Sequence, residues 1–195
     1  MYQLAAPASA EIEVKKSRFI GMLFPVTSRA EAKQRLAELR AAHPGAVHHC
    51  WVLICDGDSG LDDDGEPSGT AARPMYNVLS HKSVANILAV VVRYWGGTKL
   101  GAGGLARAYG QAVTEAMKVA ELVAFEPLAE RRLSFGFADE AALRRLAEQR
   151  GAVVLAADYG DAVTLTVRLK AADVDAFVAE ASDLLRGALT VAAPD

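Results

Sequence analysis

An apolar run, a glycine-rich loop and a helical pattern follow one another within residues 86–109, and this stretch constrains the fold most. The β-branched run Ile87–Val92 is typical of a buried strand. Five glycines lie among the nine residues from Gly96 to Gly104, and a helical pattern starts near Ala102. Free backbone amides and the helix dipole at such a helix start both favour an anion. A tight turn that needs glycine for a positive φ is the alternative, but five glycines exceed that need.

The same stretch carries three basic residues and no acidic one. Arginine and lysine can contact phosphates, and Tyr94 and Trp95 can stack on a base, although core packing is an alternative for both aromatics. The candidate residues for an anion or nucleic acid are Arg73, Arg93, Tyr94, Gly96, Gly97, Lys99, Gly101, Gly103, Gly104 and Arg107.

Two familiar phosphate-binding motifs fit this loop poorly. A P-loop requires Lys-Ser or Lys-Thr where this chain has Ala102-Gly103. Gly101, Gly103 and Ala106 satisfy a loose dinucleotide fingerprint. However, residues 93–100 separate the strand from those glycines, whereas the fingerprint needs a tight turn. We interpret that match as coincidence.

An acidic, glycine-rich segment, residues 56–73, precedes the central stretch and is expected to be a long loop. Its candidate residues are Asp63, Asp64, Glu66, Ser68 and Thr70. An EF-hand is excluded, because Gly60 and Ala71 would occupy two of its main ligand positions. Either the carboxylates bind Mg²⁺ weakly or the segment is a solvated loop. They could also pair with the nearby arginines, and a buried pair of that kind would make both loops structural first.

Composition sets the remaining limits. The 195 residues are 52% hydrophobic and 23% charged with a net charge of −3, which predicts one large or two small folded domains. Nucleic-acid binding would therefore need a local basic patch. We find no signal peptide and no apolar run long enough to span a membrane, and we expect a cytoplasmic protein. Cys50 and Cys55 are expected on opposite faces of one strand. Their side chains would point away from each other, so we expect neither a disulfide nor a shared metal between them, which fits a reducing compartment.

We predict no catalytic residues, metal or cofactor. On a strand, only His48 and Cys50 would share a face, and two ligands are too few for a metal. Ser68 lies outside a nucleophile elbow, and no histidine can be paired with it from sequence. The absence of a convincing nucleophile or general base favours a protein that is not an enzyme.

The predicted organisation is α+β with two domains, 1–126 and 127–195. The N-terminal domain is expected to have a loose end at 1–10, a capping box at Ser28 and Glu31, and a close backbone contact at Gly110. Its expected strands are 11–14, 18–26, 47–55 and 87–92, and its expected helices begin near 29, 74 and 102. In the C-terminal domain, alternation through Leu133, Phe135 and Phe137 begins a βαββαβ pattern with helices capped by Asp139 and Asp173, which is ferredoxin-like.

Four motifs resemble the YigZ/IMPACT family. They are KSRFIG (16–21), HHC (48–50), DDGEPSGTAARP (63–74) and VVRYWGGTKLGAGGLARAY (91–109). The resemblance implies an N-terminal α/β sandwich of the ribosomal-protein and elongation-factor type. It also implies a C-terminal domain similar to domain V of elongation factor G. The resemblance further implies a link to translation, which eukaryotic relatives regulate; because that role uses an additional N-terminal domain that we do not recognise here, we do not expect the same partner. This chain has Ala72 and Asp62 where the family usually has glycine and serine.

Three hypotheses follow. The first is a translation-linked binding protein that recognises RNA, a ribosomal surface or a translation-related protein through residues 93–107. The second is a Mg²⁺-dependent enzyme or a binder of a phosphorylated small molecule or nucleotide. The third is a protein-interaction module in which both loops are structural.

Overall fold

The computed structural model describes residues 1–55 and 57–192, and it divides into two compact units, Met1–Phe125 and Glu126–Asp195. Asp56 of the predicted acidic loop and the last three residues of the predicted C-terminal domain lie outside the described residues. Each unit combines a sheet with helices, so the prediction of an α+β chain with two domains is confirmed.

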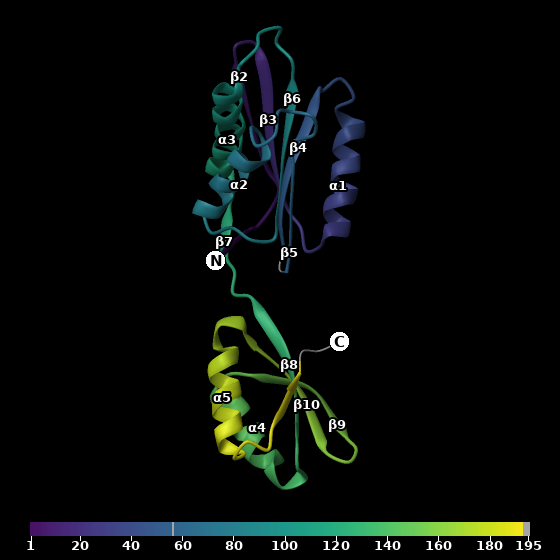
Figure 1. Cartoon of the computed structure of the whole chain (residues 1–195), viewed down its shortest axis with the longest axis vertical. Coiled ribbons are helices and arrows are strands. Elements are labelled where there is room, and N and C mark those ends of the chain that lie inside the picture. Colours follow the sequence, from purple (N-terminus) through teal and green to yellow (C-terminus); the bar gives the residue numbers. More distant parts are fainter. Residues whose placement is uncertain (56, 193–195) are drawn as a thin grey trace. The chain divides into compact units, whose positions relative to one another are not determined.

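An antiparallel sheet in the order β2-β3-β6-β4-β5 forms the centre of the N-terminal unit. Its strands are β2 (Ala8–Val14), β3 (Ser17–Pro25), β4 (His48–Cys55), β5 (Asp58–Asp62) and β6 (Ile87–Tyr94). Figure 1 shows α1 (Arg29–Ala42) on one face, and α2 (Ala72–His81) and α3 (Ala102–Val119) on the other. The sheet is therefore the middle of three layers.

The central strand β6 is buried on both faces, as its β-branched run predicts. Ile87, Ala89 and Val91 pack in the cluster under α2 and α3. Leu88, Val90 and Val92 pack in the cluster under α1. By the same alternation, Arg93 points towards the α2 and α3 side, where its side chain is buried.

Both cysteines lie on β4 and belong to different core clusters. Cys50 packs on the α2 and α3 side, and Cys55 packs on the α1 side. Both thiols are free and buried. The prediction that they point to opposite faces is confirmed.

Two segments of the N-terminal unit that were expected to be irregular contain strands. Residues 1–10 are ordered, because β1 (Tyr2–Leu4) pairs with β7 (Leu122–Ala124) and Leu4 enters the core. The segment expected to be one long loop contains β5, which pairs with β4. The partner of β1 is distant in the sequence, so the local sequence carries no signal for that pairing. The partner of β5 is the preceding strand β4, and β5 is hard to recognise because its residues, DSGLD, show no apolar alternation.

The start of α1 has half of the predicted capping box. The Ser28 hydroxyl accepts a hydrogen bond from the Glu31 backbone N–H, as predicted. The Glu31 carboxylate, however, accepts from the Thr27 backbone N–H rather than from Ser28. The reciprocal contact has moved one residue towards the N-terminus.

The C-terminal unit is a ferredoxin-like βαββαβ domain with the strand order β11-β8-β10-β9. Its elements are β8 (Leu128–Phe135), α4 (Glu140–Gln149), β9 (Val153–Tyr159), β10 (Val163–Lys170), α5 (Val174–Leu184) and β11 (Thr190–Ala192). Phe137 lies in a 3-10 turn and is exposed, so the predicted strand ends earlier at Phe135. Asp139 and Asp173 precede the helices without donating or accepting a side-chain capping bond.

The close backbone approach expected at Gly110 occurs instead at Gly21 on β3. A Cβ atom at Gly21 would lie 2.4 Å from the Ala112 carbonyl oxygen of α3. A Cβ atom at Gly110 would lie 3.9 Å from Pro74 and Val78, which is ordinary contact. Gly21 therefore sets how closely α3 approaches the sheet.

The first prediction compares these two glycines. We expect Gly21→Ala to lower the free energy of unfolding of the N-terminal unit by about 1 to 3 kcal/mol, because the helix must move away from the sheet. Gly110→Ala should raise it by up to about 1 kcal/mol, because alanine favours a helix interior. Trp51 and Trp95, the two tryptophans, both lie in this unit, so urea unfolding followed by tryptophan fluorescence measures it selectively. Equal effects of the two substitutions would contradict this assignment.

Candidate functional site

The acidic loop is held together by its own carboxylates. Asp63 accepts hydrogen bonds from the backbone N–H groups of Gly69, Ala71 and Ala72, at 2.7 to 3.0 Å. It therefore provides an acceptor for backbone N–H groups at the start of α2 that have no partner within the helix. Asp64 accepts from the Arg40 guanidinium and, at 2.6 Å, from the His49 backbone N–H. Hydrogen bonds to its own loop and the start of α2 therefore occupy Asp63, and hydrogen bonds to α1 and β4 occupy Asp64.

A buried ion pair joins the acidic loop to the central strand. Arg93 Nη1 lies 2.5 Å from Glu66 Oε1, and both side chains are less than 5% exposed. The Tyr109 hydroxyl on α3 donates to the same carboxylate oxygen at 2.7 Å. One carboxylate thus connects the loop, β6 and α3.

This pair decides the role of Arg93. Its guanidinium lies over the rings of Phe19 and Trp95, at 5.4 and 5.1 Å from their centroids. The buried partner and the covering rings exclude it as an exposed phosphate contact, contrary to the sequence expectation. Its Nε atom is buried and has no hydrogen-bond partner in the part of the chain that the structure describes.

The Cys50 thiol lies close to this cluster and donates to the Asp63 carbonyl oxygen. Burial raises the pKa of Cys50 to about 12, so the thiol is protonated at neutral pH. Burial also raises the pKa of the Tyr109 hydroxyl. Both groups therefore remain neutral and pack as part of the core.

His48 and His49 point to different surroundings, as neighbours on a strand must. His48 Nδ1 lies 2.7 Å from the Asp64 carbonyl oxygen, which can only accept, so Nδ1 carries the proton. When the ring is neutral, Nε2 is left as an acceptor, 3.8 Å from Glu66 Oε1. Burial lowers the pKa of His49, which favours its neutral form.

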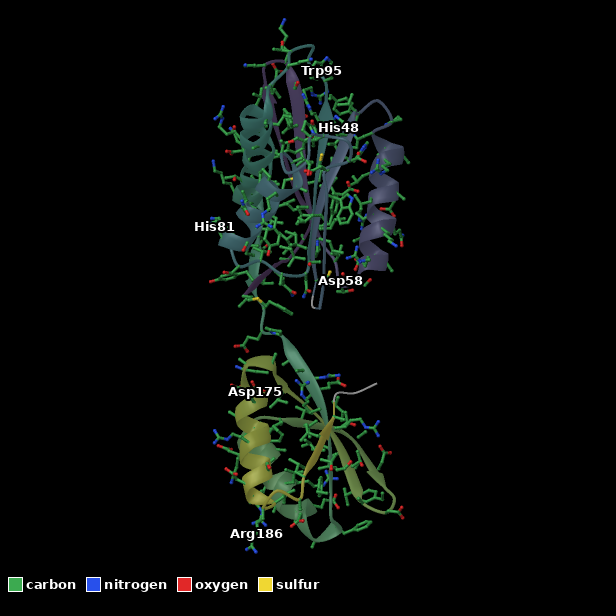
Figure 2. The ribbon with its side chains drawn as sticks, viewed as in Figure 1. His48, Asp58, His81, Trp95, Asp175 and Arg186 are labelled. Carbon is green, nitrogen blue, oxygen red and sulfur yellow. The ribbon has the colours of Figure 1, made fainter. Side chains whose placement is uncertain are left out.

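A cavity of about 370 Å³ opens beside the ion pair, and we call it the Arg93 cavity. Its polar lining comes from His48, Glu66, Arg93 and Lys99, and Trp95 borders it. Its other lining residues are Val47, Pro67, Leu100, Gly101, Ala102 and Leu105. Figure 2 shows Trp95 near one end of the N-terminal unit, with His48 on β4 close by. The cavity therefore has an apolar wall, two hydrogen-bond acceptors (His48 and Glu66) and two cationic groups (Arg93 and Lys99).

The start of α3 forms part of this wall. Gly101 precedes the helix with φ of 71° and provides no side-chain cap. The first helical hydrogen bond runs from the Leu105 N–H to the Gly101 carbonyl. The backbone N–H groups of residues 102–104 precede that bond, so the electropositive end of an 18-residue helix lies at the cavity wall.

The glycines of the loop have different functions. Gly96 is required by packing, since a Cβ atom there would lie 2.0 Å from the Lys16 carbonyl carbon. Gly97 and Gly101 have positive φ values. Gly103 faces open space, and at Gly104 a Cβ atom would lie 3.2 Å from the Leu100 side chain.

The remaining predicted residues do not gather in one place. Arg73 covers the Tyr76 ring and lines a separate recess beside Ser59, and Arg107 lines another with Lys15. Tyr94 bonds His43 through its hydroxyl, on the α1 side, so it cannot form one stacking platform with Trp95. Thr70 is buried and bonds the Pro67 carbonyl, whereas Ser68 is exposed.

Sequence reasoning missed two lysines. Lys15 and Lys16 form the exposed turn between β2 and β3, with φ values of 47° and 65°. The turn lies against the glycine loop, since Gly96 packs on the Lys16 carbonyl and donates its N–H to the Ser17 hydroxyl. Two adjacent lysines between strand patterns were the available signal, but their position beside the loop depends on the sheet.

Two further observations concern the whole described chain. No group of three or more His, Cys, Asp or Glu side chains suited to a metal is found among residues 1–55 and 57–192. No helix in that same part has the length and apolar character needed to cross a membrane.

Comparisons with known proteins match each unit to a protein family. The Impact N-terminal domain family matches residues 15–117, and a domain of unknown function (DUF1949) matches residues 133–188. The IMPACT family member YigZ of Escherichia coli is 41% identical, over 97% of this chain and 95% of its own length. An IMPACT family member of Haemophilus influenzae is 36% identical, over 98% and 97%.

A solved structure agrees with these matches. It is described as the crystal structure of a hypothetical protein, and it is 39% identical to this chain with a TM-score of 0.67. The alignment covers 100% of this chain and 97% of that one.

The second prediction tests the buried ion pair. We expect Glu66→Ala or Arg93→Ala to lower the free energy of unfolding of the N-terminal unit by about 3 to 5 kcal/mol, because each leaves one buried charge without its partner. Arg107→Ala removes an exposed cation from the same region and should change it by less than about 0.5 kcal/mol. The measurement is urea unfolding followed by tryptophan fluorescence. An Arg93→Ala protein as stable as Arg107→Ala would contradict the proposed role of the pair.

The third prediction concerns pH. Partial burial raises the pKa of Asp64, but the Arg40 and His49 hydrogen bonds outweigh it and hold the pKa below its ordinary value of 3.8. The stability contributed by this carboxylate is therefore present above pH 3.8 and is lost as the pH falls through the lower pKa of the folded state. Asp64→Asn tolerates the positive φ of 44° and should be less stable than the natural protein at neutral pH.

That difference in unfolding free energy should shrink as the pH falls below 3.8. Glu121→Gln, which changes an exposed acid in the same unit, is the matched control and should show no such change. A difference that stays constant from neutral to acidic pH would contradict the assignment.

Proposed function

The chain belongs to the IMPACT family, and on that premise we propose that it is a non-enzymatic, translation-linked protein that binds RNA. The proposed binding surface is one end of the N-terminal sheet. It comprises Lys15, Lys16, Lys99 and Arg107, and we call it the basic end.

The observation that carries this proposal is the gathering of these four cations from two separate segments. Figure 1 shows the turn between β2 and β3 and the loop between β6 and α3 at the same end of the sheet. Lys15 and Arg107 line one recess, and Leu100 borders both this recess and the Arg93 cavity. All four cations are exposed, and none has an ion pair within the described residues. Exposed cations on neighbouring segments favour contact with a phosphate backbone.

Trp95 supports single-stranded RNA as the partner. It is 48% exposed beside the basic end, and its ring is held by the Arg93 guanidinium. An exposed aromatic ring next to cations is typical of surfaces that stack an unpaired base. The net charge of −3 means that this patch, rather than the whole molecule, would attract RNA.

The rival enzyme hypothesis is less well supported. Mg²⁺ at the acidic loop would have to displace the backbone and guanidinium hydrogen bonds that Asp63 and Asp64 already accept. The Cys50 thiol is protonated at neutral pH because burial raises its pKa to about 12. The buried Glu66–Arg93 pair occupies an acid of the acidic loop and the arginine of β6. Lys99 on the glycine loop and Arg107 on α3 are the exposed cations that remain for RNA.

The fourth prediction tests the basic end with a fluorescent single-stranded RNA oligonucleotide. We expect Lys99→Ala combined with Arg107→Ala to weaken binding. It should also reduce the slope of log affinity against log salt by about 1.4, since each lost phosphate contact to a single strand contributes about 0.7. Fluorescence anisotropy at several salt concentrations measures both quantities.

The matched control combines Lys33→Ala with Lys82→Ala, which removes the same charge elsewhere. Lys33 lies early in α1, after β3 has ended at Pro25, and Lys82 precedes the start of β6 at Ile87; these two strand ends pair with each other at the opposite end of the sheet. The control should bind nearly as the natural protein does. No RNA binding at low salt, or an equal loss in the control, would overturn the proposal.

A further inference from the structure

The Arg93 cavity is an unassigned site whose walls define a small ligand. Its volume of about 370 Å³ is within the range of small-molecule sites. Its lining has one region that favours negative charge, one that accepts hydrogen bonds and one that is apolar and aromatic. Each region restricts the ligand in a different way.

The region that favours an anion combines Lys99 with the start of α3. Lys99 is exposed and has no ion-pair partner within the described chain. The uncapped N–H groups at Gly101 and Ala102 add the positive end of the helix. The positive end of the helix and the Lys99 ammonium therefore face the same cavity. Arg93 also lines this cavity and adds positive charge to its wall, while its guanidinium stays paired with Glu66.

The accepting region is formed by His48 and Glu66. The hydrogen bond from His48 Nδ1 to the Asp64 carbonyl leaves Nε2 as an acceptor when the ring is neutral. Glu66 Oε1 already accepts from Arg93 and Tyr109, and within the described chain no hydrogen bond reaches Oε2. A ligand that fills the cavity must therefore bring donors, such as hydroxyl groups, to this side.

The apolar region is formed by Trp95 with Leu100, Leu105 and Pro67. Trp95 is half exposed, and the Arg93 guanidinium lies 5.1 Å from its ring centroid. The exposed part of the ring is a large apolar surface against which a flat group can pack.

We infer that the Arg93 cavity binds a phosphorylated nucleoside, with the phosphate at Lys99 and the start of α3, the sugar hydroxyls at His48 and Glu66, and the base against Trp95. The nucleotide is either free or the phosphorylated end of an RNA strand, and the chemistry of the site is the same for both. This inference deepens the proposed RNA binding, on which it rests, by naming the group that is recognised.

The fifth prediction uses isothermal titration of the full chain with AMP, adenosine and inorganic phosphate. We expect AMP to bind at least ten times more tightly than adenosine or inorganic phosphate, because only AMP fills both the anionic and the aromatic regions. Lys99→Gln should weaken AMP binding at least tenfold, with little effect on adenosine. Arg73→Gln removes an exposed cation from a separate recess and should leave AMP binding unchanged.

A second variant tests the accepting region. His48→Asn keeps a side-chain N–H in place of Nδ1 for the Asp64 carbonyl and removes the Nε2 acceptor. It should weaken the binding of AMP more than that of its 2′,3′-dideoxy analogue. Unfolding followed by tryptophan fluorescence shows whether each variant is folded.

Three RNA oligonucleotides of one sequence separate the two sources of the nucleotide. They carry a 5′-phosphate, a 3′-phosphate or hydroxyl groups at both ends. Tighter binding of one phosphorylated strand, lost in Lys99→Gln, assigns the cavity to an RNA end, whereas binding of AMP alone assigns it to the free nucleotide and removes support for RNA binding. Equal binding of all three strands with no AMP binding overturns the inference and leaves the RNA proposal standing. Equal binding of AMP and adenosine overturns the inference as well.

Discussion

The buried contact between Arg93 and Glu66 is the interaction on which the rest of the N-terminal unit depends. Arginine on the central strand β6 would be an isolated charge in the core without this partner. The carboxylate is brought there by the acidic loop, and the Tyr109 hydroxyl of α3 donates to the same oxygen. Removing the two charges from water is costly, so the group stabilises the fold only when Arg93, Glu66 and Tyr109 are all present. It therefore specifies one arrangement of loop, strand and helix.

In this arrangement, some charged side chains are bonded within the protein and others are exposed and free to contact a ligand. Asp63 accepts hydrogen bonds from the backbone of its own loop, Asp64 accepts from Arg40, and Glu66 accepts from Arg93. Lys99 remains exposed on the glycine loop and Arg107 on α3, and the β2–β3 turn adds Lys15 and Lys16. The Arg93 cavity lies where the two groups of charges meet, so its wall carries the structural acid Glu66 and the available cation Lys99. The same contact that stabilises the fold therefore shapes the candidate site.

Much of the fold was predictable because local periodicity reports burial directly. The run at β6 is apolar at every position from Ile87 to Val92, and both of its faces are covered. The C-terminal alternation along β10 places Val163, Leu165, Val167 and Leu169 in one core, as a half-buried strand requires. Strand β1 was missed because its partner β7 is distant in the sequence. Strand β5 was missed because its residues, DSGLD, show no apolar alternation, although its partner β4 directly precedes it. Gly110 was misjudged because the distance between a helix and its neighbours is not encoded locally.

The sequence alone determined the family, the two-domain organisation, the central strand and the importance of the acidic and glycine loops. Those properties follow from patterns that neighbouring residues carry. Only the tertiary structure decided that Arg93 and Glu66 form a buried pair, that Tyr94 faces α1, and that Lys15 and Lys16 join Lys99 and Arg107. The sequence shows where a charged residue lies in the chain, but not whether it is buried against a partner or exposed to water. Its role is set by which distant segment the sheet places beside it, and that is a property of the folded chain.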